Sequence, residues 1–322
     1  MNLWKIPQKD PVISPGMLHE SFDKSRAGAA HVIQPGDKYR MVYWGSDAQG
    51  LHHILQAETP VATPNHWQPV GVPLLGPQPE THYNCQGPSF PFLLPLTQDR
   101  WLLYFTGWGR RDDANLPNTT GVAISDDGGM NWQYHPEHPV IPLDRAYDAE
   151  GTGSLWIVQD NDLLRMYYTA IGTYCAAPEG VETGHGARIP KIGIAYAEST
   201  DGIHWKKPLD DLVVAPSGFG VEPYEYICSK PCVVRQRHGY TMWVNTFGTA
   251  YRVHRLVSTD GVQWQWAERV GPDGELGVGE AGAFDDQQRS YPTIIEDNGT
   301  LHCWFTGNQF GTTGMGYAVS QE

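Results

Sequence analysis

Short runs of apolar and aromatic residues recur along the chain at a nearly constant interval. Five runs of seven residues follow this pattern: Tyr39–Gly45, Trp101–Gly107, Leu164–Ala170, Tyr240–Thr246 and Leu301–Gly307. Their first residues are 62, 63, 76 and 61 positions apart. A repeat of this length, rich in aromatic and β-branched residues, is typical of a β-propeller with one four-stranded blade per repeat. The pattern therefore predicts an all-β fold, a five-bladed β-propeller that spans residues 1–322 as a single domain.

Each repeat also carries signals for the other strands of a blade. A short apolar run before each seven-residue strand predicts an innermost strand, at His31–Ile33, Phe90–Leu94, Leu155–Val158, Cys232–Val234 and Thr293–Ile295. A third strand is clearest at Gly121–Ser125, Ile192–Ser199, Arg252–Ser258 and Gly314–Ser320. With a fourth, outer strand after these three, we expect four antiparallel strands in each blade.

A Ser-x-Asp-Gly pattern that ends in Trp links the third strand to the fourth in three repeats, at Ser125–Trp132, Ser199–Trp205 and Ser258–Trp264. Gly after Asp favours the positive φ of a tight hairpin turn, so we interpret these turns as scaffold. The last repeat reaches only its third strand, which ends at Ser320, whereas Trp4–Pro7 resembles an outer strand. We expect the N-terminal segment to supply the outer strand of the last blade and to close the ring.

Two segments exceed the length of the repeat, Thr173–Pro190 and Trp108–Thr120. Both connect a second strand to a third, so they belong to the face where the innermost strands begin. Loops of this length in a compact domain usually carry function. We therefore expect the ligand to bind on this face, near the propeller axis.

An aromatic residue followed by an acid or its amide precedes every innermost strand. The pairs are Phe22-Asp23, Tyr83-Asn84, Tyr147-Asp148, Tyr224-Glu225 and Phe284-Asp285. In one interpretation, these side chains hold the N–H groups of loops. In the other, several carboxylates converge on one cavity, where their repulsion raises a pKa and provides a general acid. Glu150 adds an acid to the third repeat, and Arg26, Lys230 and Arg289 add cations close to innermost strands.

Charge and composition exclude several classes of function. The net charge of −14 argues against a nucleic-acid partner, which would require a basic face. No apolar run has the length of a membrane span or a signal sequence, so we expect a cytoplasmic protein that binds no membrane. The five cysteines lack zinc-type spacing and indicate free thiols. His31, His82 and His185 share no ligand spacing either, and we expect neither a metal ion nor another cofactor.

At these positions the chain resembles the five-bladed propeller glycosidases of glycoside hydrolase families 43, 32, 68, 117 and 130, and most of all uncharacterised glycosidase-like proteins. The resembling segments are Phe22–Gly28, Gly151–Ser154, Glu225–Cys232 and Ala283–Asp285. Family 43 enzymes place a base Asp in the first blade, a tuning Asp in the third and an acid Glu in the fourth. The resemblance implies that Asp23 is the base, Asp148 or Glu150 the tuning group, and Glu225 the acid.

The resulting prediction is a glycoside hydrolase that uses carboxylate general acid and base catalysis on a small carbohydrate or glycoconjugate. The residues expected to bind substrate are Arg26, Trp44, Asn84, Trp108, His185, Lys230, Asp285, Arg289 and Asn308. Trp44 and Trp108 could equally be core residues. Glycosyl transfer or phosphorolysis is an alternative, with a phosphate site formed by Arg110 and Arg111 and by Arg26 or Arg289. A non-catalytic carbohydrate-binding propeller, or one recruited to a biosynthetic step, is a second alternative. The oligomeric state is left open.

Overall fold

The computed structural model describes residues 3–113, 115–180, 183, 185–216, 225–268 and 273–321. Tyr224, one of the predicted aromatic residues, lies outside the described residues. Within them the chain forms nineteen β-strands and one short helix, α1 (Asn308–Gly311), so the fold is all-β. The chain divides into two compact units, Met1–His138 with Val278–Glu322, and Pro139–Gly277.

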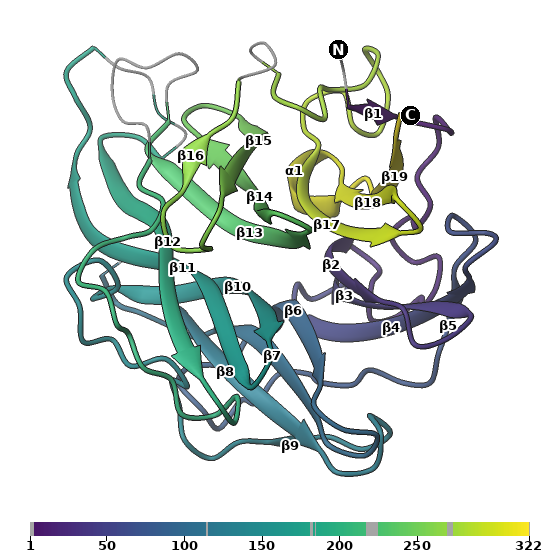
Figure 1. Ribbon diagram of the computed structural model, residues 1–322, viewed down its shortest axis with the longest axis horizontal. Coiled ribbons are helices and arrows are strands. Elements are labelled where there is room, and N and C mark those ends of the chain that lie inside the picture. The colour runs from purple at the N-terminus through teal and green to yellow at the C-terminus, as the bar shows by residue number, and fades with distance from the viewer. Residues whose placement is uncertain are drawn as a thin grey trace. The chain divides into compact units, whose positions relative to one another are not determined.

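The first unit contains three four-stranded antiparallel sheets (Figure 1). One consists of β2 (Arg26–Ile33), β3 (Lys38–Ser46), β4 (His52–Pro60) and β5 (Gln68–Pro69). The next consists of β6 (Gly87–Pro95), β7 (Trp101–Trp108), β8 (Asn118–Ser125) and β9 (Gln133–Tyr134). The third follows the order β1 (Trp4–Lys5), β19 (Met315–Ser320), β18 (Thr300–Thr306) and β17 (Ser290–Asp297).

The two ends of the chain meet in this third sheet. Strand β1 pairs antiparallel with β19, with Trp4 opposite Ser320 and Lys5 opposite Val319 (Figure 1). Ile13 adds an isolated bridge to Met315 farther along the same edge. The predicted pairing of the N-terminal segment with the last repeat is confirmed.

The second unit contains two antiparallel sets of strands that a single bridge joins into one seven-stranded order. Its strands are β10 (Gly151–Asp160), β11 (Leu163–Ala176), β12 (Arg188–Ser199), β13 (Ile227–Gln236), β14 (Gly239–Phe247), β15 (Tyr251–Ser258) and β16 (Gln265–Trp266). One parallel bridge, between Ile192 and Ile227, joins β12 to β13, whereas the other neighbours pair antiparallel.

The fourth strand of the third repeat is reduced to isolated bridges, from Ile194 to Val214 and from Glu198 to Lys206. Pro208 follows closely and has no N–H to donate to a ladder, which limits pairing there. The long segment predicted at Thr173–Pro190 is largely an extension of β11 and β12, with Tyr174 opposite Pro190.

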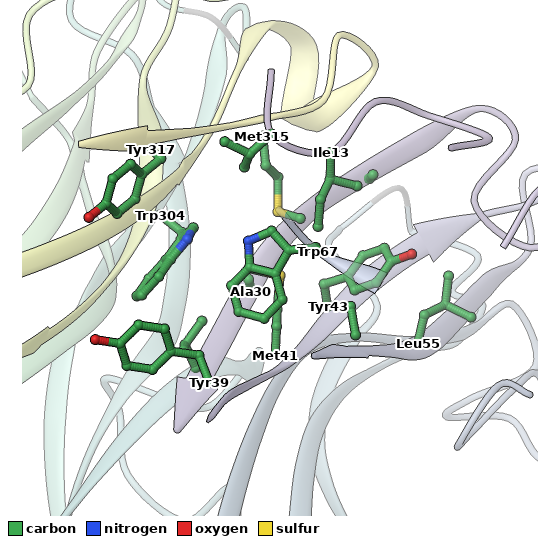
Figure 2. Packing of buried hydrophobic residues seen from close by; sticks show 14 residues of the cluster. Ile13, Ala30, Tyr39, Met41, Tyr43, Leu55, Trp67, Trp304, Met315 and Tyr317 are labelled. Carbon is green, nitrogen blue, oxygen red and sulfur yellow. The ribbon is translucent and has the colours of Figure 1, made fainter. Parts of the chain in front are cut away.

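The predicted seven-residue strands lie in β3, β7, β11, β14 and β18, and most of their residues are buried. In the first unit, aromatic side chains of these strands fill the space between neighbouring sheets. Figure 2 shows Trp67 and Trp304 at the centre of such a cluster, with ring centroids 5.7 Å apart and nearly perpendicular planes. Tyr39 packs edge-on against Trp304 at 5.4 Å. Aromatic burial of this kind supplies much of the stabilisation of a sheet-on-sheet core.

The Ser-x-Asp-Gly turns are scaffold, as predicted. In the turn after β15, the Ser258 hydroxyl donates to Asp260 at 3.0 Å and accepts the Gly261 N–H at 2.9 Å. The Tyr167 hydroxyl of β11 donates to the Gly261 carbonyl at 2.8 Å. The turn is therefore closed on itself and attached to the preceding repeat.

Every innermost strand contains a register shift at the same point of the repeat. The shifts lie between Gly28 and His31, Ser89 and Phe92, Thr152 and Leu155, Ser229 and Cys232, and Ser290 and Thr293. Residues inside four of these bulges have positive φ, namely Ala29 (47°), Phe90 (47°), Lys230 (47°) and Tyr291 (52°). The predicted innermost strands began at or inside this bulge and were therefore too short. Such bulges redirect side chains and are common beside active sites.

Candidate functional site

In the first unit, aromatic side chains from three sheets lie around one cation. We call this group the Arg26 cluster: Arg26, Trp44, His52, Phe90, Trp108, Tyr291 and Phe310. The ring centroid of Trp44 lies 5.5 Å from that of Phe90 and 5.1 Å from that of His52. The His52 centroid lies 5.8 Å from that of Trp108. Phe90 in turn lies 5.1 Å from Tyr291, which stacks on Phe310 at 6.2 Å. The bulges of β6 and β17 carry Phe90 and Tyr291, so the irregular backbone helps to form this cluster.

The Arg26 guanidinium lies over the Trp44 ring, 4.7 Å from its centroid. Partial burial lowers the pKa of Arg26. Burial and the nearby Arg26 charge lower the pKa of His52 to about 4, so His52 is neutral at pH 7. Among the described residues, no carboxylate forms an ion pair with Arg26, and the buried Nε of Arg26 and Nε1 of Trp44 have no hydrogen-bond acceptor.

The two predicted stacking tryptophans differ in exposure. Trp44 is 3% exposed, as a core residue would be. Trp108 is half-buried, and its Nε1 donates to Ser89 Oγ at 2.5 Å. Only Trp108 therefore combines an oriented ring with partial exposure.

Asp23 and Asn84 are fully buried in the loops before β2 and β6. The Tyr43 hydroxyl donates to Asp23 Oδ2 at 2.8 Å, and burial next to Asp23 raises the pKa of Tyr43. The other oxygen, Asp23 Oδ1, has no partner among the described residues. The Asn84 amide donates to the Tyr134 hydroxyl at 3.4 Å and to a backbone carbonyl. Asn84 thus serves its loop, whereas one buried carboxylate oxygen of Asp23 accepts no hydrogen bond.

Asp285 and Arg289 form an ion pair at 2.6 Å beside a small pocket of about 180 Å³. An exposed pair between Lys9 and Glu280, at 2.8 Å, lies on the same pocket. Arg289 therefore has an acidic partner. Asn308, in α1, accepts two backbone N–H groups of the loop before β17 at 3.0 Å each, which fixes that loop.

In the second unit, Asp148 is fully buried and both of its oxygens are occupied. Its Oδ2 accepts from the Tyr168 hydroxyl at 2.8 Å and from Lys207 Nζ at 2.5 Å. Its Oδ1 accepts the Arg145 N–H at 3.0 Å. A carboxylate held in this way orients its loop.

Glu150 and Glu225 occupy equivalent places in the second unit. Glu150 directly precedes β10, and Glu225 lies two residues before β13. The strand order makes β10 and β13 parallel, and the two strands pack beside each other. The two acids therefore lie at the same end of neighbouring strands. Glu225 is 1% exposed, and its Oε1 lies 3.3 Å from Nε2 of the equally buried His254.

Two further predicted residues, Lys230 and His185, also belong to the second unit. Lys230 occupies the β13 bulge, its N–H donates to Thr169 Oγ1 at 3.0 Å, and its Nζ lies 5.7 Å from the Trp156 ring of β10. His185, from the extension between β11 and β12, shares a 2.5 Å hydrogen bond with the hydroxyl of Tyr226, the residue after Glu225. Burial lowers the pKa of His185.

Sequence reasoning missed several of these residues, above all His52, Phe90, Tyr291, Trp156 and His254. A signal for some of them exists: a Ser-x-Pro pattern recurs in three innermost strands, at Ser89–Pro91, Ser229–Pro231 and Ser290–Pro292. In each case the middle residue is the bulged one with positive φ. The two histidines give no such signal, because each is defined by contacts made after folding.

The remaining predictions concern arginines, thiols and metals. Arg111 pairs with Asp113 at 2.6 Å, and Arg110 is exposed. All five cysteines are free thiols, and three of them are buried. Among the residues that the structure describes, no group of three or more His, Cys, Asp or Glu side chains is arranged to hold a metal ion. In the same residues, no helix is long and apolar enough to span a membrane.

Several solved structures described as glycoside hydrolases have a similar fold. A structure described as "Glycoside hydrolase" is 16% identical, with a TM-score of 0.72 over 98% of this chain and 92% of that chain. Another, described as "The GH130 family of mannoside phosphorylases contains glycoside hydrolases that target beta-1,2 mannosidic linkages in Candida mannan", is 13% identical, with a TM-score of 0.71 over 98% and 93%. A thermostable family-43 glycoside hydrolase is 13% identical, with a TM-score of 0.63 over 96% and 91%. The chain thus has the fold of the β-propeller glycosidases.

Sequence relatives occur in two strains of Mycobacterium tuberculosis, CDC 1551 / Oshkosh and ATCC 25618 / H37Rv. They are uncharacterized protein MT1551 and uncharacterized protein Rv1502, each 30% identical over 305 residues that cover 94% of this chain and 95% of the relative. No family model matches the chain. Identity at this level over nearly the whole length of both proteins shows common descent, and the chain belongs to the same family as MT1551 and Rv1502.

Proposed function

We propose that this protein is a carbohydrate-active enzyme that cleaves a glycosidic bond, with Glu225 as its general acid. One observation carries the proposal: Glu150 and Glu225 lie at the same end of two neighbouring parallel innermost strands. Glycoside cleavage requires two carboxyl groups of different protonation state near one bond. The likeness to glycoside hydrolases supports a carbohydrate as the ligand, and it supports the prediction of five blades in a single domain.

Each acid has a separate role in the proposed reaction. Glu225 donates its proton to the leaving oxygen as the glycosidic bond breaks, and a base removes a proton from the attacking water. Glu225 is buried beside His254, whose Nε2 lies 3.3 Å from its Oε1 and holds the carboxyl group in place. Glu150 is the neighbouring charge that adjusts Glu225, and Asp148 orients the loop. Asp23, with one unpaired oxygen, is proposed as the base.

Hydrolysis fits the cations better than phosphorolysis does. A phosphate site needs several converging positive groups. Of the arginines predicted for such a site, Arg111 pairs with Asp113 and Arg289 pairs with Asp285. Arg26 and Arg110 have no acidic partner among the described residues, but Arg110 is exposed, and a single guanidinium is too little for a dianion.

The test is turnover of a panel of nitrophenyl glycosides and of β-1,2-mannobiose, with and without inorganic phosphate. We expect activity that does not require phosphate and that falls by about 10²- to 10⁴-fold in Glu225→Gln. Glu150→Gln and Asp23→Asn should also lose activity. Glu296→Gln, on an exposed position of β17, is the matched control and should behave as wild type. Full activity in Glu225→Gln would refute the proposed acid, and turnover only with phosphate would assign phosphorolysis.

A further inference from the structure

The Arg26 cluster contains one positive charge and no negative one. Its rings are Trp44, Phe90, Trp108, Tyr291 and Phe310, and its only other titratable cation, His52, is neutral at pH 7. Arg26, His52, Phe90 and Trp108 are half-buried and Phe310 is 38% exposed, so a ligand can reach the cluster.

A partly buried guanidinium without a counterion is energetically unfavourable, because desolvation costs more than contact with an aromatic ring returns. The buried Arg26 Nε has no hydrogen-bond acceptor among the described residues, and no described carboxylate pairs with the guanidinium. Core-packing arginines normally reach a carboxylate or a carbonyl. An anionic ligand would supply the counterion that Arg26 lacks.

We propose that the Arg26 cluster, within the first unit, is a binding site for a sugar that carries a carboxylate, with Arg26 binding the acidic group and the partly exposed rings packing on the sugar. The inference rests on the proposed function, because it names the class of glycoside that the enzyme accepts. It assigns Arg26 a different role from the hydroxyl contact predicted from the sequence.

The choice of a carboxylate over a phosphate follows from charge and shape. A single guanidinium neutralises a monoanion and matches the planar, bidentate geometry of a carboxylate. A phosphate would require further cations. Of the other arginines predicted for a phosphate site, Arg111 and Arg289 are paired with carboxylates and Arg110 is exposed. The aromatic surroundings also suit a pyranose face better than a free inorganic ion.

Isothermal titration calorimetry on the full chain tests the subsite directly, because binding of monosaccharides does not depend on turnover. The probes are glucuronic and galacturonic acid, the matched neutral sugars glucose and galactose, glucose 6-phosphate, and inorganic phosphate. We expect the two uronic acids to bind about tenfold or more tightly than their neutral counterparts, since a neutral sugar leaves Arg26 unpaired. High salt should weaken this preference.

Three variants identify the residues responsible. Arg26→Gln should abolish the preference for the acidic sugar. Arg237→Gln removes one charge from an exposed position of the second unit and should leave the preference intact. Circular dichroism confirms that each variant is folded, and Arg26→Lys provides a variant that retains the charge.

The outcomes separate the inference from the proposed function. Equal binding of acidic and neutral sugars, a preference that survives Arg26→Gln, or tighter binding of either phosphate probe than of the uronic acids would overturn the inference. Selective uronic acid binding in a protein without glycosidase activity would uphold the subsite and refute the enzyme. Turnover of neutral glycosides without acidic preference would do the reverse.

Discussion

The fifth residue of the seven-residue strand decides how the acid before the innermost strand is held. Where this residue is a tyrosine, its hydroxyl donates to the acid: Tyr43 to Asp23 and Tyr168 to Asp148, each at 2.8 Å. In the last repeat this residue is a phenylalanine, and Asp285 pairs with an arginine instead. Hydrogen bonds and ion pairs therefore hold these predicted acids in the structure, in line with one of the two sequence interpretations. The acids differ in how many of their carboxylate oxygens accept a hydrogen bond.

Buried neutral histidines make the stability of the first unit depend on pH. His138 stacks on Tyr83 with ring centroids 3.3 Å apart, shares a 2.7 Å hydrogen bond with Thr119, and has its pKa lowered to about 4 by burial. In the unfolded chain its pKa returns to about 6.5. The unfolded state therefore takes up a proton first as the pH falls, so this stabilisation is complete above pH 6.5 and is lost between pH 6.5 and 4.

His138→Phe should retain the stacking on Tyr83 but remove this titration. Between pH 7.5 and 4.5, we expect the unfolding free energy of the wild type to fall by about 1–3 kcal/mol more than that of the variant. Urea denaturation at a series of pH values measures the difference. Parallel curves for the two proteins would show that His138 does not titrate between these pH values.

At the level of elements, the bulge in each innermost strand connects the fold to the candidate sites. Hydrophobic patterning located all five second strands correctly, because their burial on both faces leaves a local record in sequence. The bulges leave almost none, since they depend on register with the neighbouring strand. Phe90, Lys230 and Tyr291 owe their direction to those bulges, and only Lys230 was predicted to bind substrate.

Ala29 and Ala30 in the β2 bulge provide a test of this backbone strain. Ala29 has a φ of 47°, which disfavours any residue with a β-carbon, whereas Ala30 is not among the residues with positive φ. Ala29→Gly relieves strain but removes a buried methyl group, so we expect a change within about 0.5 kcal/mol. Ala30→Gly has no strain to relieve and should destabilise by about 1–2 kcal/mol. Equal losses in the two variants, measured by denaturant unfolding, would contradict a strained bulge.

At the level of the whole molecule, the first unit is assembled from both ends of the chain. Strand β1 covers the edge of β19, and Val12 and Ile13 are buried in the core cluster of Figure 2. The exposed edge of a sheet is prone to pair with other chains, so this pairing protects the last sheet as well as stabilising it.

Removal of residues 1–6 should therefore uncover β19 specifically. We expect faster amide hydrogen exchange in Met315–Ser320 and a loss of several kcal/mol of unfolding free energy, because the buried Trp4 ring is lost together with the ladder. Hydrogen exchange mass spectrometry compares β19 with β12 of the second unit as the internal reference. Unchanged exchange in β19 would mean that the N-terminal strand adds no protection.

The sequence by itself determined the all-β class, the five recurring strands, the Ser-x-Asp-Gly turns and the pairing of the two ends. These features follow from local propensity and from a repeat that is visible in the sequence itself. Only the tertiary structure decided that a bridge joins β12 to β13, that both oxygens of Asp148 accept hydrogen bonds, and that Arg26 lacks a counterion. Burial and charge pairing are properties of residues that are distant in sequence, and their free energies arise only when folding removes water from between them.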